Sequence, residues 1–242
     1  MKLEVWGKSD TGQKRDSNQD SMLIDEKYGL FIVADGMGGH KGGEVASALA
    51  IEEMQKFIRN AVDSNEVTSP RELISKAYQA ASGVIYNKSL EENGKLKGMG
   101  TTMVMAFHYK DELYIGNVGD SRAYLFLPPY LWQLTEDHSL INEQIRAGFL
   151  KEDQRSTVVG RNVITRSVGY EPVVECDIIV RDLHPGERFL ICSDGLTGLV
   201  GDERIADIMM IMDCSEVAER CVDEANWNGG DDNVTTLVIR VT

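Results

Sequence analysis

The sequence predicts an α+β protein in which antiparallel sheets carry helices packed on their outer faces. Three observations indicate this class. Apolar runs typical of strands follow one another directly, two long helical patterns stand together between residues 44 and 92, and two shorter ones stand together near the C-terminus. Grouped strands and grouped helices are typical of antiparallel sheets, whereas parallel sheets need the two in alternation.

In the first half of the chain, a buried strand is predicted at 30–34 and two helices follow it. Apolar residues recur at helical spacing through residues 44–62. The second helix runs from Ser69 to about Glu92 and begins with a capping box, in which Ser69 is the N-cap and Glu72 lies three residues later. The apolar faces of both helices are expected to pack against the core.

The second half alternates apolar runs with turn residues. A hairpin turn is predicted at 109–111, and two further helices at about 202–211 and 215–225. Between the two groups, residues 138–165 form a short helix followed by a polar stretch, which indicates an insert or flap over the body of a single domain spanning 1–242. The remaining strands are predicted at 101–107, 112–118, 123–127, 176–180, 189–192 and 234–241.

The chain is acidic, with a formal net charge of −14. It is therefore expected to bind neither nucleic acid nor an anionic membrane surface. No apolar run reaches the roughly 20 residues of a membrane-spanning helix, and the first residues do not resemble a secretory signal, which predicts a cytoplasmic location. If the substrate carries phosphate, the negative potential of the protein would repel it, and a bound divalent cation must make the potential positive at the site.

Aspartates follow or precede several of the apolar runs. Asp35 and Asp194 each end a run and precede glycine, Asp120 follows GNVG, Asp232 lies just before the last strand, and Asp20 precedes the strand at 30–34. A single Asp-Gly pair usually only forms a turn. Because the same pattern recurs at the mouths of separate strands, we expect the five carboxylates to converge at one edge of the sheets.

Such a set of oxygen ligands suits hard divalent ions, Mn²⁺ or Mg²⁺. Two ions held by a shared carboxylate can activate water and stabilise a phosphoryl group. Zinc is disfavoured because the four histidines are scattered and no Cys/His ligand spacing occurs. The sequence also contains no GxxxxGK[ST], no Cys-x5-Arg cradle and no GxSxG, which argues against the phosphate loops and nucleophiles of those motifs.

The chain resembles the bacterial metal-dependent Ser/Thr protein phosphatases, the PPM family of the type 2C class. The resemblance covers nearly the whole chain. Its motifs are KRDSNQD (14–20), VADGMGGHKGGE (33–44), GMGTT (98–102), GNVGDSRAY (116–124), LTEDHSL (134–140), RNVITRSVG (161–169), LICSDGLT (190–197) and GGDDNVT (229–235).

The resemblance implies a sandwich of two antiparallel sheets flanked by helix pairs, with the flap beside the active site. It also implies that Arg15 grips the substrate phosphate and that a water bridging two ions attacks phosphorus. Met37 stands where some members carry a general-acid histidine, which leaves His40 as either the proton donor or a structural histidine of the loop. The implied metal ligands are Asp20, Asp35, the Gly36 carbonyl, Asp194 and Asp232, with Asp35 as the bridge, and Asp120 with Asp194 for a third ion.

The resulting hypothesis is a monomeric, Mn²⁺- or Mg²⁺-dependent phosphatase that removes phosphate from Ser and Thr of proteins and opposes a bacterial Ser/Thr kinase. Two alternatives remain at this point. One is a non-catalytic regulatory domain of the same fold that binds a phosphoprotein or kinase, although no metal carboxylate is missing. The other is nucleotide binding by the glycine-rich loop 36–43, which lacks the lysine of a phosphate loop.

Overall fold

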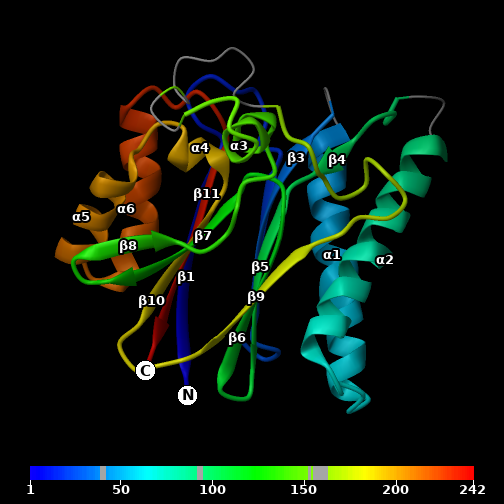
Figure 1. Ribbon diagram of the computed structural model, residues 1–242, viewed down its shortest axis with the longest axis horizontal. Coiled ribbons are helices and arrows are strands. Elements are labelled where there is room, and N and C mark those ends of the chain that lie inside the picture. The colour runs from blue at the N-terminus through cyan, green and yellow to red at the C-terminus, as the bar shows by residue number, and fades with distance from the viewer. Residues whose placement is uncertain (39–41, 92–94, 152–153, 155–162) are drawn as a thin grey trace.

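Two antiparallel sheets face each other in a computed structural model of the chain, which describes residues 1–38, 42–91, 95–151, 154 and 163–242 (Figure 1). The first sheet has the strand order β1 (Leu3–Asp10), β11 (Val234–Val241), β10 (Arg188–Cys192), β7 (Arg122–Leu127) and β8 (Tyr130–Gln133). The second has the order β2 (Asp20–Asp25), β3 (Leu30–Met37), β5 (Met103–Tyr109), β6 (Glu112–Val118) and β9 (Asp177–Asp182), and the short β4 (Gly100–Thr101) pairs with β3.

Helices cover the outer face of each sheet (Figure 1). The pair α1 (Gly42–Asp63) and α2 (Pro70–Glu91) packs on the β3 sheet, whereas α4 (Asp194–Thr197), α5 (Asp202–Ile211) and α6 (Cys214–Trp227) pack on the β11 sheet. The helix α3 (Leu140–Arg146) lies between β8 and β9 in the sequence. The predicted class, a sandwich of two antiparallel sheets between helix pairs, is confirmed.

Strand β3 shows why the central strands have continuous apolar sequences. Phe31 and Val33 point into the core between the sheets, and Leu30 and Ile32 point into the core beneath α1 and α2. Because both faces of the strand are buried, no polar residue can alternate with the apolar ones. Burying one such side chain contributes about 1.5–3 kcal/mol, so these layers hold the strand ends that carry the aspartates in place.

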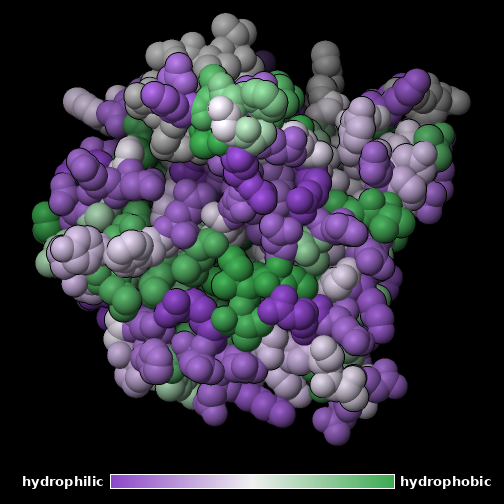
Figure 2. Space-filling model, viewed as in Figure 1, coloured by the Kyte–Doolittle hydropathy of each residue, from purple (hydrophilic) through white to green (hydrophobic). Residues whose placement is uncertain are grey.

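The predicted helices and strands all occur, with small shifts at their ends. The Ser69 Oγ accepts a hydrogen bond from the Glu72 N–H at 3.3 Å, as expected of the cap. The structure adds strands β1, β2 and β8, which the apolar pattern did not reveal. No helix among the described residues is long and apolar enough to cross a membrane. Hydrophobic residues form a band across the middle of the face in Figure 2, where the edge strands β8 and β9 lie.

Candidate active site

The strand ends beside the predicted aspartates lie at the end of the sandwich opposite the chain termini (Figure 1). Asp20 opens β2 and lies directly opposite Asp35 of β3 in the sheet register. Asp194 follows β10, Asp120 follows β6, and Asp232 precedes β11. Since neighbouring strands are antiparallel, strand ends and strand starts alternate at this edge, and it gathers acids from five separate chain segments.

Three of these carboxyls form a tight group. The Asp35 carboxyl interacts electrostatically with those of both Asp20 and Asp194. Burial, together with the neighbouring negative charges, raises the pKa of Asp20 to about 6 and the pKa of Asp35 well above its usual range. Burial and the charge of Asp194 raise the pKa of Asp120 to about 7. Asp120 is therefore the fourth member of this electrostatically coupled group.

The group presents oxygen atoms to which no described residue donates a hydrogen bond. Asp20 Oδ1 and Asp194 Oδ1 are buried and accept no hydrogen bond from any described residue. A buried, unpaired carboxylate oxygen is costly unless a cation balances it, and an all-oxygen donor set suits a hard divalent ion. The residues therefore fit a metal, although no three acidic, histidine or cysteine side chains in the described ranges already surround one point.

Two hydroxyl groups fix the orientation of Asp20. Its Oδ2 accepts hydrogen bonds from Ser193 Oγ at 2.8 Å and Thr235 Oγ1 at 2.7 Å. Ser193 also accepts a bond from the Thr235 N–H at 3.0 Å, which joins the end of β10 to the start of β11. These hydroxyls hold one carboxylate oxygen and leave Oδ1 free. The sequence interpretation missed both residues, although each stands within a motif, close to an aspartate.

The backbone of β3 is held by β4 and by the start of α1. The Asp35 carbonyl accepts bonds from the Thr102 N–H at 2.8 Å and from Thr101 Oγ1 at 2.7 Å. A Cβ on Gly36 would lie 2.0 Å from the Gly43 carbonyl oxygen, so only glycine permits this approach of strand and helix. Gly36 and Gly43 therefore serve the packing of β3 against α1, which accounts for these two glycines without a nucleotide.

Arg15 lies at the rim of the group and contacts one of its predicted ligands. Its Nη2 donates to Asp232 Oδ2 at 2.7 Å, and about half of the side chain is exposed. The loop that carries it is fastened by Asn233, whose amide Nδ2 donates to the carbonyls of Thr11 at 2.8 Å and Ser17 at 2.9 Å. Asn233 Oδ1 accepts from the Gln19 N–H at 2.8 Å. Asn233 thus fixes Arg15 beside the carboxylates.

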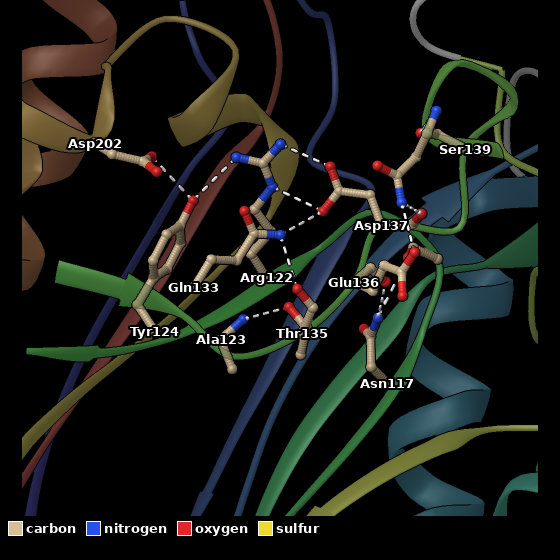
Figure 3. Close-up of polar contacts among 12 residues, drawn as sticks. Asn117, Arg122, Ala123, Tyr124, Gln133, Thr135, Glu136, Asp137, Ser139 and Asp202 are labelled. Atoms are coloured by element: carbon tan, nitrogen blue, oxygen red, sulfur yellow. Dashed lines mark hydrogen bonds and ion pairs between the residues drawn. The ribbon is translucent and has the colours of Figure 1, made fainter. Parts of the chain in front are cut away.

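Asp120 is positioned by its neighbours on both sides. The Gly119 N–H donates to His138 Nδ1 at 3.0 Å, and the His138 N–H donates back to the Gly119 carbonyl at 2.9 Å. Two residues after Asp120, Arg122 makes a bidentate pair with Asp137, with distances of 2.9 and 2.6 Å (Figure 3). Burial alone would lower the pKa of Arg122, but its hydrogen bonds to Asp137 outweigh this effect and raise the pKa above its usual range.

The Arg122–Asp137 pair is part of a wider frame. Tyr124 Oη accepts from Arg122 Nη1 at 3.0 Å and donates to Asp202, and Gln133 Nε2 donates to Asp137 at 2.9 Å (Figure 3). The side chains of Arg122 and Asp137 are only 19% and 7% exposed. The frame connects β7, β8 and the start of α5 next to the Asp120 loop, so it supports the site without contacting the predicted ligand atoms.

Replacing Asp137 by alanine is expected to lower the free energy of unfolding by about 3 kcal/mol, because a half-buried guanidinium loses its partner. Urea denaturation measures the change. The control is Lys76→Ala, which removes the exposed Lys76–Glu72 pair and should cost less than about 1 kcal/mol. If both variants lost a similar free energy of unfolding, the Arg122 frame would contribute no more to stability than an exposed ion pair does.

The structure thus brings together Asp20, Asp35, Asp120 and Asp194, and places Asp232 and Arg15 together at the rim. Gly36 lies next to Asp35 at the contact with α1. His40, the predicted proton donor, lies outside the described residues, as does most of the polar part of the predicted flap.

The fold is shared with solved structures of bacterial Ser/Thr protein phosphatases. The serine/threonine phosphatase PstP/Ppp of Mycobacterium tuberculosis superposes with a TM-score of 0.91 at 32% sequence identity, covering 100% of this chain and 99% of that one. A structure of the PstP catalytic domain in complex with 2 manganese ions gives a TM-score of 0.87 at 32% identity, covering 99% of each chain.

The chain belongs to the protein phosphatase 2C family, whose match extends over residues 10–224. Serine/threonine phosphatase stp of Listeria welshimeri is 35% identical over 238 residues, which are 96% of this chain and 93% of that protein. The predicted activity is therefore confirmed: the protein is a metal-dependent protein serine/threonine phosphatase. The non-catalytic regulatory alternative is not favoured.

Proposed function

We propose that Asp20, Asp35, Asp194, Asp232 and the Gly36 carbonyl hold two divalent ions, Mn²⁺ or Mg²⁺, with Asp35 shared between them, and that Asp120 with Asp194 holds a third. The observation that carries this proposal is the buried group of coupled carboxyls with unpaired Oδ1 atoms on Asp20 and Asp194. The manganese in the related PstP catalytic domain supports it. Bound there, such ions lower the pKa of a water and balance charge on a phosphoryl group.

The residues of this chain have separate tasks in that reaction. The hydroxyls of Ser193 and Thr235 hold Asp20, so that its free oxygen faces the group rather than solvent. Arg15 presents a guanidinium fork at the rim, where it can bind two oxygens of a phosphate. The ion pair of Arg15 with Asp232 supports this role, because it places the fork against a proposed ligand. A phosphate bound to Arg15 would therefore lie against the carboxylate group.

Hydrolysis of a phosphothreonine peptide by the purified protein tests the proposed metal dependence. We expect release of phosphate in Mn²⁺ or Mg²⁺, none after chelation, and recovery when either ion is added back. Equilibrium dialysis with Mn²⁺ measures the number of ions bound without relying on activity, and two or three per chain are expected. Full activity in excess chelator, or no bound Mn²⁺, would contradict the assignment.

Arg15→Lys is expected to lower kcat/KM for the phosphopeptide by about tenfold, and Arg15→Ala by about a hundredfold, because charge-assisted bonds to phosphate contribute about 1.5–3 kcal/mol. Most of the loss should appear in KM. Steady-state kinetics at saturating Mn²⁺ gives both constants. Lys14→Gln, which removes the adjacent charge that pairs with Asp231, serves as the control and should stay within about threefold of the wild type. An equal loss of kcat/KM in Lys14→Gln would show that the reaction depends on positive charge near the site and not on the guanidinium group of Arg15.

The same proposal includes phosphorylated Ser/Thr proteins as substrates, an opposing Ser/Thr kinase, a monomeric state and a cytoplasmic location, without nucleic acid or membrane as a partner. The net charge of −14 supports the absence of nucleic acid and membrane as partners. The four cysteines are free thiols, and three of them are buried. Comparing the phosphoproteins of cells with and without the protein would identify its substrates and show whether a kinase is among them.

A further inference from the structure

A cavity of about 560 Å³ opens beside the carboxylate group. One wall is the end of β3, where Met37 and Gly38 follow the predicted ligands Asp35 and Gly36. The other wall is the segment 164–174, which passes β4 and the adjoining ends of α1 and α2 before it enters β9 (Figure 1). None of the features described above accounts for this cavity.

Backbone pairing places Val168, the neighbour of the lining residue Ser167, relative to Gly36. Gly36 pairs with Thr101 of β4, and Thr101 exchanges two hydrogen bonds with Val168, at 2.9 and 2.8 Å. Neighbouring strands lie about 4.8 Å apart, so the segment at Val168 is roughly 10 Å from Gly36. An extended peptide advances about 3.3 Å per residue. A substrate residue two or three positions from the phosphorylated one therefore reaches the cavity.

The lining combines apolar residues with polar ones, the polar ones being Thr165, Arg166, Ser167 and Glu171. Met37, Ile164, Val173 and Val174 contribute aliphatic surface, and Val173 remains 60% exposed. The one cation of the lining, Arg166, is engaged in an ion pair with Asp177 at 3.0 Å. Because its charge is balanced within the chain, the cavity offers more to an apolar side chain than to an acidic one.

The outer wall is also fixed to the body of the protein. Ser82 of α2 accepts a bond from the Gly169 N–H at 2.9 Å and donates to the Glu171 carbonyl at 2.7 Å. A wall held in this way loses little conformational freedom when a ligand binds, which favours binding. The cavity is thus a preformed pocket beside the reaction centre.

We propose that this cavity is a specificity subsite, which receives an apolar side chain two or three residues from the phosphorylated Ser or Thr of a protein substrate. The inference rests on the proposed function, since the distance is counted from the proposed metal ligands. It adds a preference among phosphoproteins: substrates with leucine, methionine or an aromatic residue near the phosphorylated residue are favoured over those with glycine or an acid.

Phosphothreonine peptides that differ at one position test the subsite. Leucine, phenylalanine, glycine or aspartate is placed two or three residues before or after the phosphothreonine, and kcat/KM is measured with Mn²⁺. Burial of most of a leucine side chain predicts a preference of about tenfold over glycine at one of these positions. Equal kcat/KM for leucine and glycine at all four positions would overturn the proposal.

The variant Val173→Asp places a charge in the wall, and Ile211→Asp places the same charge on the exposed end of α5. The leucine-to-glycine ratio should fall toward one in the first variant and stay unchanged in the second. The introduced aspartate repels the phosphate of both peptides equally. Because the leucine-to-glycine ratio is taken within each variant, this repulsion does not affect it. An unchanged ratio in Val173→Asp would overturn the subsite, whereas failure of every variant and the wild type to hydrolyse p-nitrophenyl phosphate would instead overturn the proposed function.

Discussion

Replacing Asp194 by asparagine is expected to lower kcat on a phosphothreonine peptide by about 10³-fold or more. Asp194 interacts electrostatically with Asp35, and the pKa of Asp120 is raised by burial and then by the charge of Asp194, so Asp194 is proposed to hold more than one ion. An amide keeps the shape but removes the negative charge that balances a cation. Loss of one preorganised electrostatic group at a reaction centre costs on the order of 10²–10³ in kcat, and loss of a shared metal ligand should exceed this.

The matched control is Asp231→Asn, which removes a carboxylate that is exposed, pairs with Lys14 and stands next to Asp232 without being a proposed ligand. It should keep kcat within about threefold. Mn²⁺ binding by Asp194→Asn, measured by equilibrium dialysis, should weaken in parallel with the activity. Normal Mn²⁺ binding by an inactive Asp194→Asn would show that the residue acts other than as a ligand.

Metal-free protein is expected to become less stable as the pH rises from about 6 to about 8. The pKa of Asp20 is about 6 and that of Asp120 about 7 in the folded state, against 3.8 for an unperturbed aspartate. The folded protein therefore holds protons that the unfolded chain has released, and the stability gained is complete below pH 3.8 and lost as the pH rises through about 7. The expected loss is about 1–2 kcal/mol, or several degrees in Tm.

Thermal unfolding in chelator at the two pH values measures this loss. With Mn²⁺ added, Tm should rise, and the rise should be larger at the higher pH because the ions compete with protons for the same carboxylates. Asp120→Asn should reduce the pH dependence of the metal-free protein. A Tm in chelator that stays constant or increases toward pH 8 would contradict the coupling of these carboxyls.

The parts of the fold that could be predicted are those in which one physical effect dominates. Leu30–Val33 is buried on both faces, so its apolar run is unbroken, and the amphipathic stripes of α1 and α2 have helical spacing. Strand β1 was missed because all of its residues are half-buried and its polar and apolar residues are mixed. Strand β8 was missed because it lies at an edge with Tyr130 and Trp132 exposed, so that packing imposes no pattern on it.

Asp35 and Asp194 were visible because each ends an apolar run at a place where a charge is costly, and Asp20, Asp120 and Asp232 because they stand beside further apolar runs. Their supports were not visible in the same way. Ser193 and Thr235 are ordinary residues until the register of β10 and β11 brings both hydroxyls to Asp20. Likewise, the pairing of Arg15 with Asp232 joins residues 217 positions apart, and no local pattern indicates it.

The bonds of Asn233 have a consequence for biosynthesis. They fasten the loop that carries Arg15 to the start of β11, and β11 itself lies between β1 and β10 in its sheet. A growing chain from which β11 has not yet emerged therefore lacks the neighbour of β1, the clasp on Arg15 and one proposed ligand. Contacts so distant in sequence form late in folding. A nascent chain should thus be unable to remove phosphate from cellular proteins until its synthesis has passed β11.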